Sequence, residues 1–175
     1  MRKISVIIIL VVVSATFMLL KGKGKRPVDG DSVKISSLNL HPTANPSSAF
    51  NLLDPSSKLS AVFGSPLNVK TEFSEMYDGN VTQYEFEGFY ASYFEGHAIS
   101  NQIKNSTVSL GIVGAGSIKI GDSINKLESI FPKSLALKKD DQIYVSILTP
   151  SGEVSDSFLV FDYDANNVVT SIIIN

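Results

Sequence analysis

Residues 54–63 read DPSSKLSAVF, and the pattern returns as DSINKLESIF at residues 122–131, about 68 residues later. Asp, Lys, Leu and Phe recur at the same positions of the two stretches. A second similarity closes each half, because ISNQIKN at residues 99–105 corresponds to VTSIIIN at residues 169–175. The first offset is 68 residues and the second is 70, and similarity that recurs at nearly the same spacing is the sequence signature of repeated structural units. We therefore predict that one unit is used twice.

Each unit is predicted to begin with a short helix. In the first copy Asp54 stands where an N-cap belongs and Pro55 takes the first helical position, while residues 121–123 cap the second helix. Gly64-Ser65-Pro66 and Pro132 are predicted to end the two helices. An apolar stripe follows each cap at helical spacing: Leu59, Val62 and Phe63 in the first copy, and Leu127, Ile130 and Phe131 in the second.

Strands are predicted after each helix, since apolar, β-branched and aromatic residues alternate between Gly-, Asp- and Asn-containing turns. The predicted strands are 67–73, 81–86, 89–94 and 99–104 in the first copy, and 135–137, 142–148, 157–161 and 168–174 in the second. This order predicts an α+β fold of two tandem modules, each a short helix packed on an antiparallel three- to four-stranded meander, after an N-terminal apolar helix.

The N-terminus carries a candidate membrane segment. Residues 4–20 hold no charge and lie between basic residues. As a helix they span about 25 Å, at the short end for crossing a bilayer. A signal peptide and an uncleaved signal anchor are the two interpretations of residues 1–20, and the lack of small residues over 17–21 favours the anchor. The short charged start favours export of the domain to the cell envelope, periplasmic or extracellular, although the basic residues after the span leave the orientation open.

Composition divides the rest of the chain. Residues 21–49 are rich in Gly, Pro, Ser and Asn, which predicts a polar linker in which His41 is solvated and residues 33–40 add a short edge strand. The first α+β repeat is predicted over residues 50–108 and the second over residues 109–175.

The residue types present argue against several classes of function. The chain has no cysteine, which excludes disulfides, thiol nucleophiles and thiolate metal sites. No arginine follows Arg26 and the folded part is acidic, which argues against nucleic-acid binding. His97 is the one histidine of the predicted modules, so the sequence offers little for acid–base or metal catalysis. We predict no enzyme, no cofactor and no metal.

Two stretches resemble ligand-binding motifs. LGIVGAG at residues 110–116 suggests a dinucleotide-binding turn, but Lys119 stands where the third glycine belongs, so we interpret it as a flexible joint between the modules. DYDAN at residues 162–166 matches the start of a calcium loop, but Asn167 replaces the glycine and Ile173 the bidentate glutamate. A hairpin turn at Asn166-Asn167 is the better interpretation.

An aromatic cluster in the first module is the candidate binding surface. It consists of Tyr77, Tyr84, Phe86, Phe89, Tyr90, Tyr93 and Phe94. Because alternate strand residues point to opposite faces, some of these rings must point away from the helix. Such rings form natural protein contacts, and we predict Tyr77, Tyr84, Tyr90 and Tyr93 as partner-binding residues. The competing interpretation is a core that covers both faces of the sheet.

The sequence also resembles a known fold family. The helix end Phe63-Gly64-Ser65-Pro66, the strands after it and the repeat opening at residues 120–123 look like the SmpA/OmlA outer-membrane assembly proteins. The same features of this chain are also similar to those of the tandem-module β-lactamase inhibitor proteins, which share that fold. The resemblance covers about residues 50–175 and implies non-enzymatic protein binding in the envelope. The second copy departs from it, since Pro132-Lys133-Ser134 replaces the Gly-x-Pro stop and no lipidated cysteine is present.

The predicted function is a non-enzymatic, membrane-tethered or exported protein-binding module of the cell envelope. It would recognise an unknown protein partner through its sheet surface, with residues 4–20 in the membrane. The alternative is a small apolar-ligand carrier that uses a pocket between helix and sheet.

Overall fold

The computed structural model describes residues 30–175. The predicted apolar N-terminal helix and signal segment therefore lie outside the described residues. Among residues 30–175, no helix combines the length and the hydropathy needed to cross a membrane. The fold is mostly β with short helices, which agrees with the predicted α+β class at that level.

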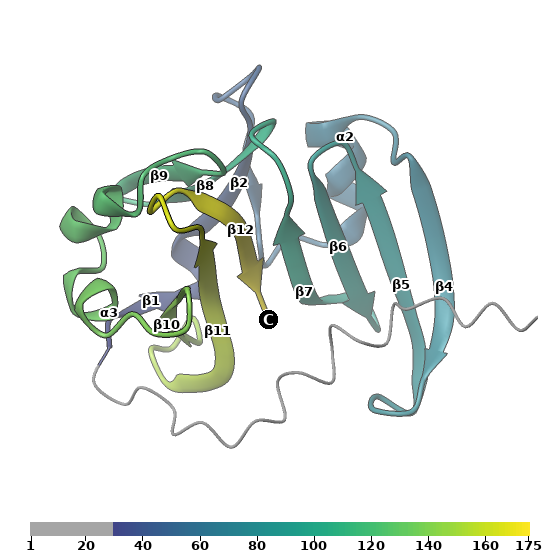
Figure 1. The fold of residues 1–175 in the computed structure, drawn as a ribbon. Helices are drawn as coiled ribbons and strands as arrows, with labels where there is room; N and C mark the ends of the chain where they lie inside the picture. Colours follow the sequence, from purple (N-terminus) through teal and green to yellow (C-terminus); the bar gives the residue numbers. More distant parts are fainter. Residues whose placement is uncertain (1–29) are drawn as a thin grey trace, which may run out of the picture.

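Twelve strands in the described part of the chain form two sheets (Figure 1). Sheet A has eight strands: β1 (Ser32–Lys34), β4 (Asn68–Ser74), β5 (Gly79–Phe86), β6 (Phe89–Phe94), β7 (His97–Ile103), β10 (Gln142–Leu148), β11 (Val154–Tyr163) and β12 (Val169–Ile174). Their order across the sheet is β1-β10-β11-β12-β7-β6-β5-β4. Sheet B has four strands in the order β3 (Phe50–Asn51), β2 (Leu38–Pro42), β8 (Val108–Ile112) and β9 (Gly116–Lys119).

The centre of sheet A is the antiparallel pair of β7 and β12 (Figure 1). Ile103 lies opposite Ile172, and Gln102 lies opposite Ile173. These strands come from the two stretches whose sequences resemble each other, so strands far apart in the chain form one continuous sheet. Most other neighbours in the sheet are joined by short hairpins.

Both helical segments pack on the same face of sheet A, called here the inner face. The 3₁₀ helix η3 (Ser56–Lys58) continues into α2 (Leu59–Phe63), and η4 (Ile124–Ser129) precedes α3 (Pro132–Ala136). The Phe63 ring centroid is 4.4 Å from that of Phe89, and Phe131 is 6.2 Å from Phe161. The apolar stripes predicted from helical spacing therefore do face the sheet.

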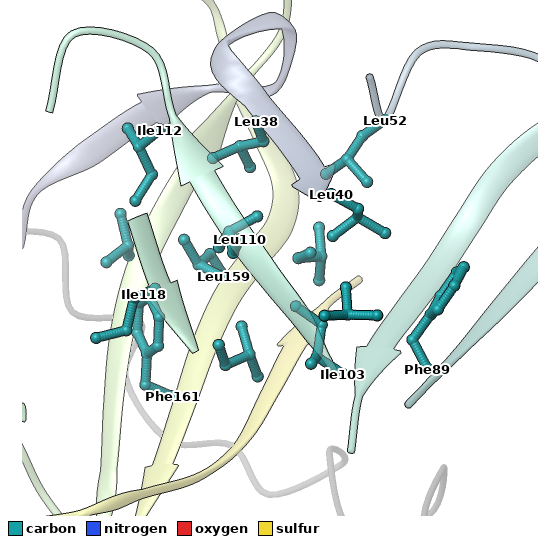
Figure 2. Packing of buried hydrophobic residues seen from close by; sticks show 14 of the residues in the cluster. Leu38, Leu40, Leu52, Phe89, Ile103, Leu110, Ile112, Ile118, Leu159 and Phe161 are labelled. Carbon is teal, nitrogen blue, oxygen red and sulfur yellow. The ribbon is translucent and has the colours of Figure 1, made fainter. Parts of the chain in front are cut away.

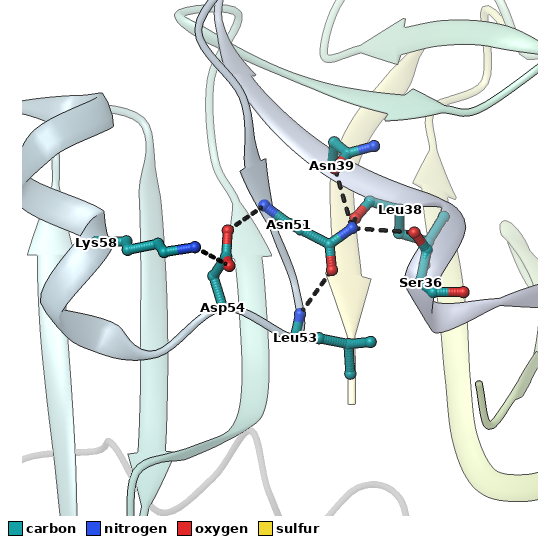
Figure 3. A network of polar contacts seen from close by, with 7 residues as sticks. All are labelled: Ser36, Leu38, Asn39, Asn51, Leu53, Asp54 and Lys58. Carbon is teal, nitrogen blue, oxygen red and sulfur yellow. Dashed lines mark hydrogen bonds and ion pairs between the residues drawn. The ribbon is translucent and has the colours of Figure 1, made fainter.

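The helix caps differ from the prediction. Pro55, with extended backbone, holds the N-cap position of η3, and no side chain caps it. The Asp54 carboxylate instead accepts from the Asn51 backbone N–H at 3.2 Å and pairs with Lys58 at 2.6 Å (Figure 3). The Asp54 carboxylate therefore stabilises the turn before the helix and does not cap the helix. In the second copy the Ser123 hydroxyl, within the predicted cap segment, accepts from the Asn125 backbone N–H.

The predicted strand at residues 135–137 is wrong, and Pro132 begins a helix instead of ending one. Pro132 takes a first-turn position of α3, where its fixed φ is already helical and no N–H is needed. Asp31 holds the helix in place: its carboxylate accepts from the Ser134 N–H, and its own N–H donates to the Ser134 hydroxyl, both at 2.9 Å. The edge next to β10 is filled by β1, which pairs with it in parallel.

The predicted linker over residues 21–49 is wrong where β1 and β2 form. Leu38 and Leu40 alternate with polar residues in β2, and both are fully buried, because they face the core between the sheets. The edge strand predicted over residues 33–40 is divided by a 3₁₀ turn at Ile35–Ser37: β1 lies at the edge of sheet A, and residues 38–40 belong to β2 inside sheet B. His41 belongs to β2 and has its Nδ1 3.0 Å from the carbonyl oxygens of Pro46 and Ser48, so it is not a simple solvated side chain.

Residues 110–116 form the hairpin of β8 and β9, so the predicted flexible joint is wrong. Leu110 is buried, and Gly114 and Gly116 have positive φ at the turn. The glycines therefore serve a tight turn between two paired strands.

The predicted turns are confirmed by backbone conformation. Positive φ occurs at Asp78, Gly88, Glu95, Gly96, Asp140, Asp141, Gly152 and Asn167. At the last of these turns Asp164 Oδ1 accepts from the backbone N–H groups of Asn166 and Val168, at 2.9 and 3.0 Å. The hydrogen bond from the Val168 N–H is the main reason why the pKa of Asp164 is lowered. The stretch that mimics a calcium loop is thus a hairpin turn closed by its own carboxylate.

One apolar core lies between the sheets and the helical segments (Figure 2). Leu38, Leu40, Leu110 and Ile118 come from sheet B, and Ile103, Leu159 and Phe161 come from the inner face of sheet A. Sheet B and the helices therefore pack on the inner face of sheet A.

Candidate binding face on the outer side of sheet A

A row of directly opposite residues crosses the outer face of sheet A. Its members come from five neighbouring strands, β6, β7, β12, β11 and β10, and we call it the outer row: Tyr90, Gln102, Ile173, Val160 and Tyr144. Strand alternation sends the residues beside them in each strand, such as Phe89, Ile103, Phe161 and Val145, into the core. The outer row is therefore fixed in position by the packing beneath it.

Tyr90 is held at one end of the outer row. Its hydroxyl donates to Glu85 Oε1 at 2.8 Å and accepts from Lys104 Nζ at 2.7 Å. The same ammonium lies 3.9 Å from the centre of the ring, a cation–π distance. The ring thus has one favoured orientation and lies between a positive and a negative side chain.

Tyr144 is held at the other end. Its ring meets Phe158 edge to face, with centroids 6.2 Å apart. Its hydroxyl donates to Gln142 Oε1, and Gln142 Nε2 donates to Asp162 Oδ1 at 2.8 Å. Burial raises the pKa of Tyr144, and the charges of Asp162 and Asp140 add to the effect. The hydroxyl therefore remains a neutral hydrogen-bond donor throughout the physiological range.

The middle of the outer row is mainly apolar. Val160 is only 3% exposed, although it belongs to the outer face, whereas Ile173 and Gln102 are partly exposed. The accessible middle of the row is therefore Ile173 beside Gln102, with a tyrosine hydroxyl at each end. Fixed aromatic rings are typical of the residues that dominate protein interfaces.

The four tyrosines predicted as contacts fall on different faces. Tyr90 belongs to the outer row, and Tyr77 stacks on Phe94, an outer-face residue, with centroids 5.1 Å apart. Tyr84 and Tyr93 point to the inner face, where their rings meet edge to face at 5.8 Å. Tyr93 is 3% exposed, so its prediction as a surface contact is wrong. The register decides this, because Tyr93 is one residue out of phase with Phe94 and shares the face of Phe89.

Sequence reasoning missed Tyr144, Phe158 and Ile173, which complete the outer face. Tyr144 lies in a strand that alternates Ile143, Val145 and Ile147 with more polar positions, and this alternation already indicates that the tyrosine points outward. The contact between the two halves needs the β7–β12 pairing, which no local pattern contains.

The buried Tyr93 hydroxyl leads to a prediction about pH. It has no hydrogen-bond partner within the described part of the chain. Burial raises its pKa well above the unfolded value of about 10, and the charges of Tyr84 and Asp54 add to this. As the pH rises, the unfolded chain therefore loses this proton before the folded chain does. The contribution of Tyr93 to the free energy of unfolding is constant below a pH of about 10 and declines above it.

Tyr93→Phe should remove that decline. At pH 8 it should lower the free energy of unfolding by less than about 1 kcal/mol, since no hydrogen bond is lost. Urea unfolding of both proteins at pH 8 and at pH 10.5 measures the difference. A loss well above that value at pH 8 would show that the hydroxyl has a partner.

The depressions on the surface bear on the ligand-carrier alternative. The one lined by Leu52, Ala98 and Ile174 has a volume of about 40 Å³. Ligand pockets are typically about 300–1,000 Å³ and mostly apolar. A more open depression of about 310 Å³ lies on sheet B, where Asn39, His41 and Ser109 line it together with Pro46, Ile112 and Val113.

Comparisons with known protein families, with curated proteins and with solved structures found no match for this chain.

Proposed function

We propose that this protein is a non-enzymatic protein-binding module of the cell envelope, membrane-tethered or exported. It recognises a protein partner through the outer face of sheet A. The observation that carries the proposal is the outer row, which places Tyr90 and Tyr144 on either side of Gln102 and Ile173. Tyrosine suits this role because a large contact area is gained while few rotatable bonds are fixed.

Rigidity supports the proposal. Glu85 and Lys104 fix Tyr90, while Phe158 and Gln142 fix Tyr144. Side chains that are already ordered lose little conformational entropy on binding, so more of the contact free energy appears as affinity. Glu85 and Lys104 at one end and Asp162 at the other place charged groups beside both tyrosines, which favours a partner with complementary charges.

We also propose that sheet A arose from two tandem modules. In each half an aspartate accepts from the backbone N–H three residues earlier and pairs with a lysine four residues later: Asp54 with Asn51 and Lys58, and Asp122 with Lys119 and Lys126. Leu59 and Leu127, at matching positions, are both buried. Strands β7 and β12, which end the two halves, pair with each other. The outer row would then join equivalent parts of two modules.

The envelope location is proposed from the sequence. Residues 4–20 are uncharged and apolar, and an anchor there would tether the module to a membrane. The resemblance to SmpA/OmlA proteins points to the same compartment and to the same non-enzymatic kind of function.

The test is recovery of a partner from membranes by crosslinking and pull-down with the full chain. Tyr90→Ala and Tyr144→Ala should each reduce recovery of the main crosslinked protein by about tenfold or more, as expected for hot-spot residues. The control is Val113→Ala, which alters an exposed apolar residue outside sheet A. Equal recovery with all three variants would contradict the proposal. A large fall in melting temperature for Tyr90→Ala would instead assign Tyr90 to the core.

A further inference from the structure

Strand β4 is an exposed edge of sheet A. It pairs with β5 along all seven residues without a bulge, and its other side has no partner among the described strands. Leu67, just before β4, is 71% exposed, and Phe73 within it is 64% exposed. Proteins usually protect such edges with proline, bulges or short strands, because free N–H and C=O groups invite another strand. Strand β4 contains none of the three, and the protective feature that it does have is a pair of charged side chains, Lys70 and Glu72.

The order of side chains along β4 is self-complementary. If a second β4 is turned antiparallel about Thr71, then Thr71 meets its own copy and Lys70 meets Glu72 of the other strand. Val69 then meets Phe73 on the inner-face side. Each contact occurs twice, as two-fold symmetry requires. Opposite charges and apolar–aromatic pairs placed directly across two strands stabilise the pairing.

The arrangement in one chain is compatible with this partner. Lys70 Nζ and Glu72 Oε1 form an exposed ion pair at 2.6 Å along the same strand. They could therefore exchange partners with a second copy without exposing a buried charge. Val69 is half exposed and would gain an apolar neighbour.

We infer that this protein forms a two-fold symmetric dimer in which the β4 strands of two copies pair antiparallel about Thr71, making one continuous sheet. The inference goes beyond the proposed function, since the outer row lies on other strands and would remain free in the dimer.

The first test is a charge reversal, followed by sedimentation of the full chain in a mild detergent. The unaltered protein should sediment as a concentration-dependent dimer. Lys70→Glu places like charges opposite each other twice and should raise the dissociation constant by about tenfold or more. Lys70→Glu combined with Glu72→Lys restores both opposite-charge pairs and should restore the dimer. A monomeric unaltered protein, or a dimer indifferent to Lys70→Glu, would overturn the inference.

The second test fixes the register and uses the absence of cysteine in the chain. The two Thr71 Cα atoms would lie about 4.5–5.5 Å apart, within the range of a disulfide. Thr71→Cys should therefore form a disulfide-linked dimer under mild oxidation. Ser74→Cys is the matched control, because its two copies would be separated by roughly 20 Å. Equal crosslinking at both positions would contradict the antiparallel pairing, whatever the outcome for the outer row.

Discussion

Leu110→Ala should lower the free energy of unfolding by about 3–5 kcal/mol, as expected when a large buried side chain is truncated. Leu110 is fully buried in β8, between Leu40 and Ile118 on the neighbouring strands, where sheet B meets sheet A (Figure 2). Alanine would leave a cavity that tightly packed neighbours cannot fill. Urea unfolding at neutral pH measures the change, and the melting temperature should fall by roughly 10 °C or more.

Leu53→Ala is the matched control, because the same atoms are removed from a side chain that is 50% exposed. Its cost should be about 1 kcal/mol or less. If the two leucine variants lost the same stability, sheet B would not be packed on sheet A as described.

The second large effect is expected at the turn between β5 and β6. Gly88 has φ of +93°, and a Cβ added there would lie 2.1 Å from Thr107 Oγ1 and 2.6 Å from Asn105 Oδ1. Its carbonyl also accepts from the Lys104 backbone N–H at 2.7 Å, so the turn cannot easily move away. Gly88→Ala should cost about 2–4 kcal/mol, as backbone strain and the displaced side chains add.

Gly96→Ala separates these two causes. Gly96 has a similar φ of +81°, but no heavy atom lies within 4 Å of the added Cβ. Gly96→Ala should lower the free energy of unfolding only through the strain of a positive φ in alanine, by about 1–2 kcal/mol. Thermal unfolding of both variants gives the comparison, and equal losses would mean that residues 105–107 do not brace the turn.

The local features of the fold could be predicted from the sequence. Strands β6 and β10 have the predicted bounds, because alternation and flanking turn residues both mark them. The turns were found because Asp, Asn and Gly are the residues that adopt positive φ at low cost. These signals are contained within a few neighbouring residues.

Features that depend on distant contacts could not be predicted in this way. Residues 33–40 read as one short edge strand in a polar linker, but Leu38 and Leu40 are buried by β8, about 70 residues away. Residues 135–137 are apolar and suit a strand, but the contact between Asp31 and Ser134 favours a helix over Pro132–Ala136. Both β8 and Asp31 lie far away in the sequence from the residues that they contact, so a local pattern does not include them.

The candidate site shows the same division. Alternation indicates that some tyrosines of the first module point outward, and Tyr90 does. Alternation alone does not tell which set of alternate residues faces outward, because that depends on the pairing with β7. The prediction of Tyr93 as a surface residue is wrong for this reason. The outer row also needs Ile173 and Tyr144 from the other half of the chain, joined through β7 and β12.

The most direct test of the outer face is site-specific photo-crosslinking from the full chain in intact membranes. A photoreactive residue replaces Gln102, at the centre of the face, or Ser117, an exposed position on sheet B. Binding through sheet A predicts a discrete protein adduct from position 102 and none from position 117. An adduct from position 117 with none from position 102 would contradict it.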